Sequence, residues 1–543
     1  MISRTAAIIA GIVVLAHLCT LQNYGYFGDE FYFIDCAKHL AWSYVDQPPL
    51  IPLIAWFTAP FGYALWALRL LPALAAGATV IVSALLAKEL GGGRYAQLLT
   101  AIAVGMAPIY LLLGSILSTS AFEPLTWTLL IYLTICIINR SSQNGDGPTG
   151  TSRDRNKQLF VLAGLIVTLG LYAKFSIAFC VLALLFSLLL AHVMSPRKQH
   201  PQLRILASPW FAIAAILCVV LISPILLWQW HHSWPMLEVL HRDALNRHAL
   251  GNGIAFESAN VVANSLFFLV TQALYLNPLL IIICIWGLLW LGFAPTASRY
   301  RFIAIAYVLL FAIMVALTAR GYYLAGFYPV LFAAGGIAIE NTLRKITPSA
   351  RVLARLQTAI AILVVLLVAV MVPFAIPILP IDSLIAYSQT LGISRPAPPD
   401  GKAHLVQPLF ADEFGWEGMT QAVARAYTAI PAAQRETTAV FADGYMYAGA
   451  LNFYGPRYQL PTAISGNNNY YLWGPGNYAG GSMLAVGATD YPIYTHLFRS
   501  VKQIAVYTNV YRWMIEGPLP IYLCTDPRIP LTKMWPLFKK YGL

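Results

Sequence analysis

The sequence contains few charged residues: Asp, Glu, Lys and Arg make up only 10% of its 543 positions. Hydrophobic residues fill 59% of the positions, and the mean hydropathy is +0.67. Soluble globular chains contain roughly 25% charged residues. The shortage of charge therefore excludes the row of soluble domains that the length alone would suggest. It indicates a protein that crosses a membrane several times.

The seven cysteines lack the spacing of a metal site or of a disulfide framework, since no Cys-x-x-Cys pair and no Cys/His ligand pattern occurs. Five of them lie in or beside apolar runs, namely Cys19, Cys136, Cys180, Cys218 and Cys284. The other two, Cys36 and Cys524, fall in segments that we assign to the same side of the membrane. A bridge between these two is compatible with the sequence.

Apolar runs of about 20 residues, the length that crosses a bilayer, recur through the first 380 residues. They predict about eleven transmembrane helices, at 5–21, 66–87, 97–114, 122–139, 159–173, 176–194, 209–228, 263–292, 302–318, 323–341 and 357–379. Asn277-Pro278 interrupts one long run, which can form an interfacial helix followed by a span. No small-x-small cleavage site follows the first run, so we interpret it as an uncleaved helix.

Basic residues are unequally divided between the two sets of loops. With the N-terminus in the cytoplasm, the inner segments hold sixteen Lys and Arg and the outer loops before residue 380 hold five. Those five are Lys38, Lys174, Arg242, Arg247 and Arg320. The positive-inside rule then places the first loop and everything after residue 380 outside. The net charge of +12 is mostly this bias, so we do not expect a nucleic-acid partner.

The segment after residue 380 has the character of a soluble domain. A Pro-rich linker at 394–402 comes first, and short β-rich runs at 437–443, 482–488 and 502–511 then alternate with helical stretches such as 414–430. Alternation of this kind predicts a small α/β domain. We therefore predict two domains. These are a transmembrane domain at 1–380 with an outer loop at 22–65, and an outer α/β domain at 381–543.

The first outer loop, YGYFGDEFYFIDCAKHL (24–40), sets two adjacent carboxylates among aromatic rings. Asp29 and Glu30 follow the first predicted helix closely, and DQPPL (46–50) comes shortly after them. One interpretation is a solvated acidic pair near a membrane surface. The other is a loop built to hold a carboxylate that acts as a base. The density of rings favours the second.

Six segments, taken in order, resemble the bacterial glycosyltransferase family 39 proteins. The first is YGYFGDEFYFIDCAKHLAWSYVDQPPLIPLIAWF, and the others are STSAFEPLTWTLLIYL, GLYAKFSIAF, LLWQWHHSWPMLEVL, RGYYLAGFYPVLFAAGG and FYGPRYQLPTAISGNNNYYLWGPG. These proteins are relatives of the protein O-mannosyltransferases and of the lipid A aminoarabinose transferase. The resemblance covers about residues 24–478 and implies a polytopic α-helical membrane protein with the GT-C fold.

The resemblance implies an enzyme of the bacterial inner membrane that moves a sugar from a polyprenyl-phosphate carrier to a lipid, glycan or protein acceptor on the periplasmic face. In that pattern the acid of the first loop is the general base, which matches Asp29, and Glu30 is a supporting carboxylate. The chemistry is sensible, because an acceptor hydroxyl needs its proton removed and a phosphate leaves more easily once its charge is neutralised. No cofactor is certain, and a divalent metal is compatible but not indicated.

Two positions depart from the pattern of the relatives. Some relatives have a basic residue before PPL, where this chain has Gln47, a candidate substrate contact. Many have Asp before the Pro of the fourth span, where this chain has Glu123, which keeps the charge on a longer arm. An ionisable group in an apolar run is costly and usually faces a cavity or a partner. Glu123 is therefore a second candidate substrate-binding residue.

Lys174 and Arg320 are the candidate contacts for the donor phosphate, because a polyprenyl phosphate needs cationic partners on the outer side. The alternative for both is plain contact with lipid headgroups. Tyr322 and Tyr323 are candidates for the same pocket, although tyrosines at a membrane interface are also routine.

Two further segments have open interpretations. WQWHHSWPMLEVLHRDALNRH (228–248) suits an amphipathic surface helix and, less well, a metal site, since its histidines match no HExxH pattern. GNNNYYLWGPG (466–476) suits either sugar contacts or a tightly turned structural loop.

Two functions are alternatives to the enzyme. A sugar-binding sensor that uses only the C-terminal domain leaves the Asp29–Glu30 loop unexplained, and the other alternative is a flippase or transporter of a lipid-linked sugar. Such a protein should carry charges along a midplane path and discontinuous helices in both halves.

Overall fold

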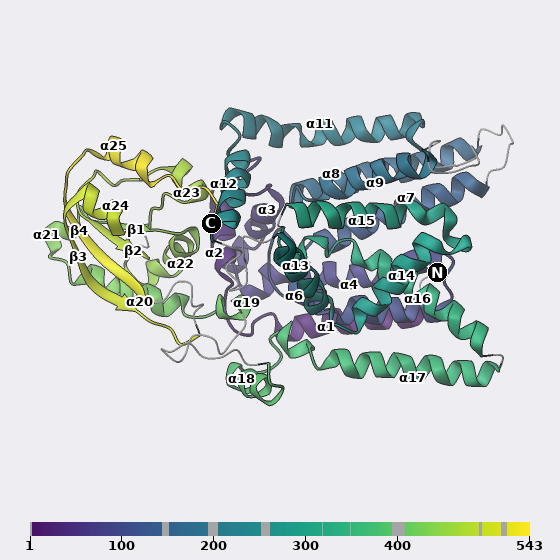
Figure 1. Cartoon of the computed structure of the whole chain (residues 1–543). Coiled ribbons are helices and arrows are strands. Elements are labelled where there is room, and N and C mark those ends of the chain that lie inside the picture. The colour runs from purple at the N-terminus through teal and green to yellow at the C-terminus, as the bar shows by residue number, and fades with distance from the viewer. Residues whose placement is uncertain are drawn as a thin grey trace. The chain divides into compact units, whose positions relative to one another are not determined.

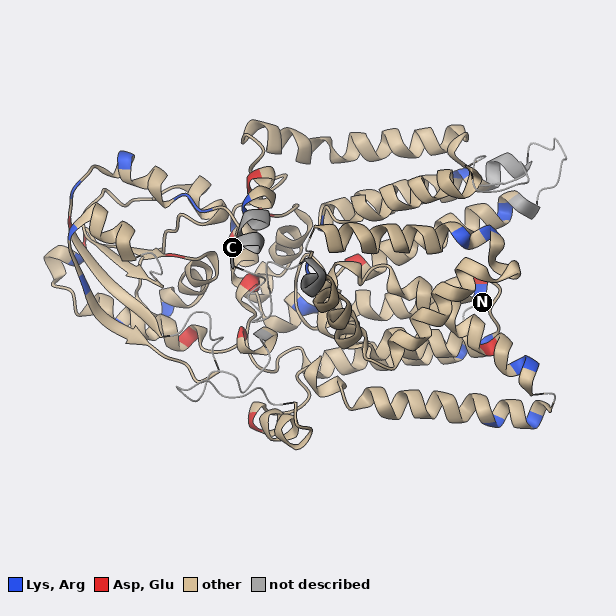
Figure 2. Ribbon diagram, in the orientation of Figure 1, with Lys and Arg blue, Asp and Glu red and all other residues tan. Residues whose placement is uncertain are grey.

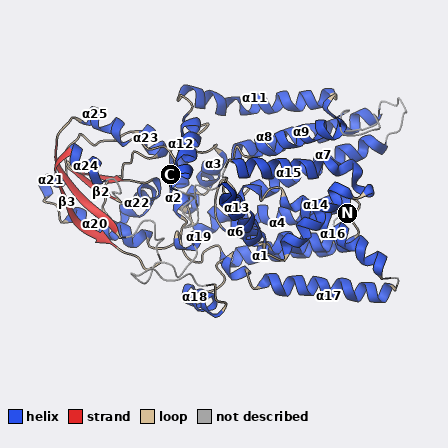
Figure 3. Cartoon of the chain, viewed as in Figure 1, coloured by secondary structure: helices blue, strands red, loops and turns tan. Residues whose placement is uncertain are grey.

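The computed structural model describes residues 3–143, 151–193, 205–250, 261–317, 319–347, 349–393, 408–487, 491–511 and 518–542. The chain forms two compact units, each assembled from separate stretches of sequence (Figure 1). The first, here called the helical unit, comprises Met1–Leu21, Arg69–Leu227 and Arg247–Ile376. The second, here called the mixed unit, comprises Gln22–Leu68, Trp228–Asn246 and Pro377–Leu543. All the strands belong to the mixed unit (Figure 3).

Each apolar run that was predicted to span the membrane falls on a helix or on a broken pair of helices. These helices are α1 (Arg4–Thr20), α4 (Leu65–Glu89), α5 (Arg94–Met106), α6 (Pro108–Ser115), α7 (Glu123–Gln143), α8 (Thr151–Ala173), α9 (Ile177–Val193), α11 (Pro209–His231), α13 (Val261–Leu276), α14 (Leu280–Phe293), α15 (Arg301–Ala316), α16 (Tyr328–Ile346) and α17 (Ala350–Ala369). Short 3₁₀ turns η2 (Pro295–Tyr300), η3 (Gly321–Leu324) and η4 (Val372–Phe374) join some of them.

Fewer helices than eleven meet the length and apolarity needed to cross a membrane alone. Among the residues described there are five, or up to seven if each of two bent helix pairs counts as one span. Helices α1 and α9 are apolar but shorter. A polytopic helical membrane protein is confirmed, while the number eleven stays a prediction.

Local chemistry explains both bends. Between α5 and α6 the axis turns by 54°, because Pro108 has no N–H to continue the helical hydrogen bonds and Ala107 before it is extended. Between α13 and α14 it turns by 110°. There Asn277 adopts a left-handed backbone with φ of 83°, and its side-chain oxygen accepts a 2.9 Å hydrogen bond from the N–H of Leu279. The predicted interruption at Asn277-Pro278 is confirmed.

Small residues let helices of the helical unit pack closely. A Cβ on Gly287 of α14 would collide with the carbonyl oxygen of Leu331, and one on Gly335 of α16 with that of Ile283. Close approach through glycine is how apolar helices gain packing contacts in a membrane. Basic residues gather at one end of this helical unit, as the positive-inside rule predicts for an inner face (Figure 2).

The sheet of the mixed unit has four strands in the order β1-β2-β4-β3. Strands β1 and β2 are parallel, and β4 pairs antiparallel with both β2 and β3. The strands are β1 (Ala439–Ala442), β2 (Met483–Val486), β3 (Phe498–Tyr507) and β4 (Leu519–Pro527). The predicted strands correspond to β1, β2 and β3. Strand β4 was missed, because Pro518 and Pro520 read as loop punctuation, although β4 lies between two partners.

The mixed unit also contains short helices. They are α2 (Gly28–Lys38), α3 (Leu50–Phe57), α12 (Pro235–Leu250), α18 (Ile381–Thr390), α19 (Pro408–Ala411), α20 (Trp416–Thr428), α21 (Ala432–Arg435), α22 (Tyr445–Tyr454), α23 (Asn468–Trp473), α24 (Tyr491–Leu497) and α25 (Leu531–Met534), with 3₁₀ turns η1 (Ala59–Phe61), η5 (Gly455–Tyr458) and η7 (Trp535–Phe538). The predicted helical stretch 414–430 is confirmed as α20. The Pro-rich linker at 394–402 lies outside the described residues.

The hydrophobic core of the mixed unit contains Cys524, one partner of the disulfide that the sequence allows with Cys36. Cys524 is fully buried with Phe441, Met483, Phe498 and Phe538. All seven cysteines are free, so the bridge between Cys36 and Cys524 does not form. The first outer loop, which we had assigned to the transmembrane domain, packs in one compact unit with the C-terminal segment. The predicted division at residue 380 stays a prediction.

Candidate active site

The acidic pair of the first loop lies in the first turn of helix α2, and its two carboxylates have different roles. Glu30 is fully buried, and its Oε2 accepts a 2.9 Å hydrogen bond from the backbone N–H of Phe27, the residue just before the helix. A carboxylate at this position satisfies an otherwise unpaired N–H and complements the positive end of the helix dipole. Glu30 therefore stabilises the turn that presents Asp29.

Asp29 is only partly buried, and its position is fixed by a residue far along the chain. The phenol of Tyr445, the first residue of α22, donates a 2.7 Å hydrogen bond to Oδ1 of Asp29. The N–H of Tyr445 in turn donates to Oδ1 of Asn467 at 2.9 Å. The carboxylate thus keeps one orientation while part of it stays accessible.

The aromatic rings around Asp29 pack the loop against α20 and α22. Phe31 is fully buried, with its ring centroid 5.7 Å from that of Trp416 and 5.5 Å from that of Phe453. Gly28 allows this approach, since a Cβ there would lie 2.5 Å from Sδ of Met446 and 3.0 Å from the Trp416 ring. The ring density that favoured a built loop therefore arises from packing.

Two more carboxylates of the loop, one buried and one partly buried, belong to a hydrogen-bonded network that sequence reasoning missed. Asp35, with 5% of its side chain exposed, pairs with Lys38 at 2.8 Å and accepts from Asn452 at 2.8 Å and Tyr470 at 2.7 Å. Burial, followed by the charge of Asp35, raises the pKa of Tyr470 well above its usual value, so the phenol stays a donor. Asp35 lies in the α2 stretch, but its distant partners leave no pattern in the sequence.

Asp46 is the second of these carboxylates, and it ties the loop to the Asn-rich segment. It accepts from the phenol of Tyr32 at 2.8 Å and from the amide of Asn468 at 3.1 Å. The next residue, Gln47, is buried, with Nε2 3.8 Å from Sγ of Cys36. Within the described part of the chain, Oε1 of Gln47 accepts no hydrogen bond. Its role as a substrate contact stays a prediction.

For the Asn-rich segment (466–476), the hydrogen bonds favour a tightly turned structural loop over sugar contacts. Asn467, Asn468 and Asn469 are all buried. Oδ1 of Asn469 accepts from the N–H of Val45 at 2.7 Å, and Nδ2 of Asn467 donates to the carbonyl of Lys540 at 2.8 Å. The amides hold the first loop and the C-terminal segment together.

In the helical unit, the structure brings together four of the predicted residues. Nζ of Lys174, in the turn between α8 and α9, lies 2.9 Å from Oε2 of Glu123 and 2.9 Å from Oγ of Ser120. The other oxygen of Glu123 accepts from the hydroxyl of Ser176. The Lys174 ammonium also lies 5.1 Å from the ring centroid of Tyr322 and 4.3 Å from that of Tyr323.

The ion pair leaves Lys174 with capacity for a ligand. Glu123 and Ser120 engage two of the three ammonium N–H groups, and 17% of the Lys174 side chain is exposed. Arg320 is exposed and directly precedes the turn that carries both tyrosines. Its carbonyl oxygen accepts a 3.0 Å hydrogen bond from the N–H of Tyr323. Because Glu123 balances Lys174, Arg320 supplies the net positive charge of this cluster.

The histidine-rich segment provides packing contacts where it is described. The His232 ring stacks on that of Trp228 at 4.0 Å, and its Nδ1 lies 2.8 Å from the carbonyl oxygen of Trp228. The side chain of His248 lies outside the described residues. Among the residues that the structure describes, no group of three His, Cys, Asp or Glu side chains could hold a metal.

Comparison with known proteins gives this architecture the GT-C fold of membrane glycosyltransferases, which confirms the resemblance predicted from the sequence. A family model described as dolichyl-phosphate-mannose-protein mannosyltransferase matches residues 46–228. ArnT from Cupriavidus metallidurans has similar crystal structures. The structure of ArnT in the apo state aligns with this chain with a TM-score of 0.55 at 13% identity, and the structure bound to undecaprenyl phosphate aligns with a TM-score of 0.54 at 14% identity. Each alignment covers 95% of this chain and 97% of the ArnT chain.

A third similar structure comes from an archaeon. The oligosaccharyltransferase AglB from Archaeoglobus fulgidus, in complex with an inhibitory peptide and a dolichol-phosphate, aligns with a TM-score of 0.51 at 12% identity. The alignment covers 90% of this chain and 70% of that chain. No curated protein sequence matches the chain. At these identities the similarity establishes a shared fold.

Proposed function

We propose that the protein is a glycosyltransferase that moves a sugar from a polyprenyl-phosphate-linked donor to an acceptor. The observation that carries this proposal is Asp29, a partly exposed carboxylate held in one orientation by Tyr445 on a GT-C scaffold. The matched family model, and the similar structures that contain undecaprenyl phosphate or dolichol-phosphate, support a lipid-linked donor.

Asp29 acts as the general base in this proposal. The acceptor hydroxyl gives its proton to Asp29 while its oxygen forms the new bond to the anomeric carbon. The bond from that carbon to the phosphate oxygen breaks, and polyprenyl phosphate leaves with the electron pair. A positioned base contributes roughly 10²–10⁴-fold to such a step. Tyr445 keeps the carboxylate aimed, and Glu30 holds the helix turn beneath it.

The donor phosphate is assigned to Lys174 and Arg320. Glu123 and Ser120 fix the Lys174 ammonium, whose third N–H can donate to a phosphate oxygen, while Tyr322 and Tyr323 flank it. Donors of this kind matter most as charge develops on the leaving oxygen. Gln47 remains a candidate contact in the mixed unit.

We place the reaction on the periplasmic face of the bacterial inner membrane. Within the helical unit, Glu123 begins α7 and Arg140 lies near its end, about 25 Å away at 1.5 Å per residue. The candidate phosphate cluster is therefore at the opposite end from the basic residues that face the cytoplasm under the positive-inside rule. A periplasm-dependent reporter fused after Leu543 should be active, and activity of a cytoplasm-dependent reporter there would reverse this orientation.

A flippase for a lipid-linked sugar is the alternative, and the two broken helix pairs are the feature in its favour. Neither break carries an acidic or basic residue: the sequence around the first is GMAPIY and around the second LNPLL. A transport path through them would have no charged group for the donor phosphate. We therefore favour transfer.

One reconstitution separates the two functions. Purified protein in liposomes containing a polyprenyl-phosphate sugar and cell-envelope extract should release polyprenyl phosphate and label an acceptor. Movement of intact donor between leaflets without cleavage would support the flippase. Mass spectrometry of envelope glycolipids and glycoproteins from a strain that lacks the gene should then identify the sugar and the acceptor by a lost mass.

A further inference from the structure

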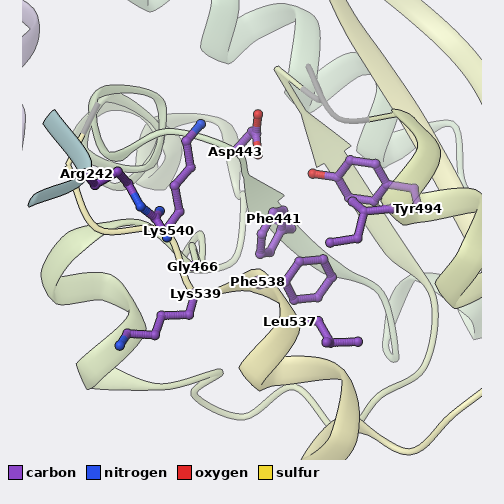
Figure 4. A pocket seen from close by; sticks show the side chains of 10 residues that line it. Arg242, Phe441, Asp443, Gly466, Tyr494, Leu537, Phe538, Lys539 and Lys540 are labelled. Carbon is purple, nitrogen blue, oxygen red and sulfur yellow. The ribbon is translucent and has the colours of Figure 1, made fainter. Parts of the chain in front are cut away.

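The mixed unit contains a cavity of about 300 Å³ that the proposed transfer chemistry does not use (Figure 4). Aromatic, aliphatic and charged side chains line it. The aromatic residues are Phe441, Tyr494 and Phe538, and the charged ones include Arg242, Asp443 and Lys540. Small-molecule sites usually measure roughly 300–1,000 Å³. This cavity therefore suits a single monosaccharide.

Two cationic side chains that line the cavity are available to a ligand. Within the described part of the chain, the side chains of Arg242 and Lys540 make no hydrogen bond or ion pair. Their neighbour Lys539 is different, because its Nζ pairs with Glu238 at 2.6 Å and lies 4.3 Å from the ring centroid of Tyr541. The side chains of Lys539 and Lys540 extend in opposite directions (Figure 4). With one carboxylate and two such cations, the cavity favours an anionic ligand.

The backbone beneath Lys540 is rigidly built. Its N–H donates to the carbonyl of Gly466 at 2.9 Å, and its carbonyl accepts from the N–H of Asn468 at 3.0 Å and from Nδ2 of Asn467 at 2.8 Å. A Cβ at Gly466 would collide with the carbonyl oxygen of Phe538, so only glycine permits this approach. The buried asparagines thus place one cation at the cavity wall, which gives the Asn-rich segment a use beyond holding the fold.

The aromatic part of the cavity suits the C–H face of a sugar ring. The centroid of the Phe538 ring lies 4.6 Å from that of Phe441 and 6.2 Å from that of Tyr494, so the three rings pack as one cluster, of which Phe538 is the most exposed at 7%. Asp443 follows β1 at its carboxyl end, beside the parallel strand β2. Ligands of α/β sheets commonly bind beyond the carboxyl ends of parallel strands. A carboxylate there can accept hydrogen bonds from sugar hydroxyls.

We propose that this cavity binds an acidic monosaccharide unit of a glycan. The ring lies over the exposed part of Phe538, Asp443 accepts from its hydroxyls, and its phosphate or carboxylate lies between Arg242 and Lys540. Use of the cavity to recognise the acceptor rests on the proposed function, whereas binding does not. A binding assay without donor therefore tests the cavity independently of transfer.

Isothermal titration of the purified full chain with four probes tests the proposal. We expect glucose 6-phosphate, glucuronic acid or both to bind, and glucose and inorganic phosphate each to bind at least roughly tenfold more weakly, since charge-assisted hydrogen bonds and ring stacking both contribute. The tighter acidic sugar identifies phosphate or carboxylate as the preferred group. Equal binding of glucose and the acidic sugars, or binding of none, would overturn the proposal. If inorganic phosphate bound as tightly as glucose 6-phosphate, the cavity would be a phosphate site and the sugar would have no part in the binding.

Three variants assign the site. Arg242→Gln and Lys540→Gln should each weaken binding of the acidic sugar by roughly tenfold or more, because each removes a charge-assisted donor. Lys502→Gln, at an exposed lysine of β3 outside the cavity, is the matched control and should bind normally. Circular dichroism confirms that all three fold alike. Unchanged affinity in both cavity variants would place the ligand elsewhere.

Discussion

The phenol of Tyr445 donates a 2.7 Å hydrogen bond to the carboxylate of Asp29, across 416 positions of sequence. It connects the first loop to the helix that follows the first strand of the sheet. The proposed base is thus oriented by a residue from the far end of the chain. If transfer depends on this orientation, substitutions at Asp29 and Tyr445 should reduce the transfer rate by different amounts.

Asp29→Asn should keep the fold and abolish transfer. The amide has the shape of the carboxylate but cannot accept the proton, so we expect a loss of roughly 10²–10⁴-fold. The measurement is turnover of polyprenyl-phosphate sugar by purified protein, with thermal unfolding as the control for folding. Normal turnover in this variant would end the assignment of Asp29 as the base.

Tyr445→Phe should have a smaller effect on transfer, roughly tenfold, because the base remains and only its orientation loosens. The loss should fall mainly on kcat rather than on KM. Tyr478→Phe is the matched control, since it also removes a phenol that donates a 2.7 Å hydrogen bond, there to the carbonyl of Gly481. Equal losses in the two variants would indicate a general effect on stability.

Lys174→Ala and Arg320→Ala should each reduce transfer by roughly ten- to a thousandfold, the range for single donors that act in the transition state. The double variant should lose little more than the worse single one, because residues that act as a unit are not additive. Lys345→Ala, at an exposed lysine of α16, serves as the control. Multiplicative losses would instead indicate two separate sites.

One complication of that series has its own control. Lys174→Ala leaves Glu123 as an uncompensated buried carboxylate, which is destabilising in itself. The pair Glu123→Gln with Lys174→Gln removes both charges and should recover much of the thermal stability. Transfer should stay low if Lys174 holds the phosphate. Recovery of transfer together with stability would return Lys174 to a structural role.

Asp35→Ala should destabilise the mixed unit strongly. It leaves the buried phenol of Tyr470 without its acceptor and removes one acceptor of the Asn452 amide, and loss of one buried charged partner costs about 3–5 kcal/mol. Lys38→Ala removes the other half of the ion pair, but that side chain is 40% exposed, so we expect about 0–1 kcal/mol. Thermal unfolding in detergent, followed by tryptophan fluorescence, should rank the two variants. Equal shifts would mean that the buried network contributes little.

The buried thiol of Cys524 predicts a pH dependence. Burial raises its pKa from 9.0 to about 12. The folded state therefore keeps the proton where the unfolded state loses it, so this contribution to stability is complete below pH 9 and is lost as the pH rises toward 12. Peptide mass spectrometry should find Cys524 alkylated at pH 8 only after denaturation. Rapid labelling of the folded protein would contradict its burial, and Cys524→Ala should flatten the stability curve above pH 9.

The sequence predicted those features that depend on local pattern. Apolar runs located the helices, Asn277-Pro278 located a break, and the short β-rich runs located three of the four strands. Strand β4 was missed because its prolines outweighed its alternating residues. The pairing of Asp29 with Tyr445 has no local signal, since partners 416 positions apart leave no pattern in one sequence. Glu30 was likewise not recognised as a helix cap, because Phe27 stands where Ser, Thr, Asp or Asn would mark the start.

The assembly of the mixed unit from three separate stretches has a consequence for biogenesis. A ribosome adding roughly 5–20 residues per second needs tens of seconds to make the 416 positions between Asp29 and Tyr445. Throughout that interval the first loop has emerged without α20, α22 or Asn468, which donates to Asp46. The nascent chain therefore lacks an oriented Asp29, the proposed base, until its last quarter is made. Premature termination should yield an inserted helical bundle with no catalytic competence, and the exposed rings of the unfinished loop are a natural target for envelope chaperones and proteases.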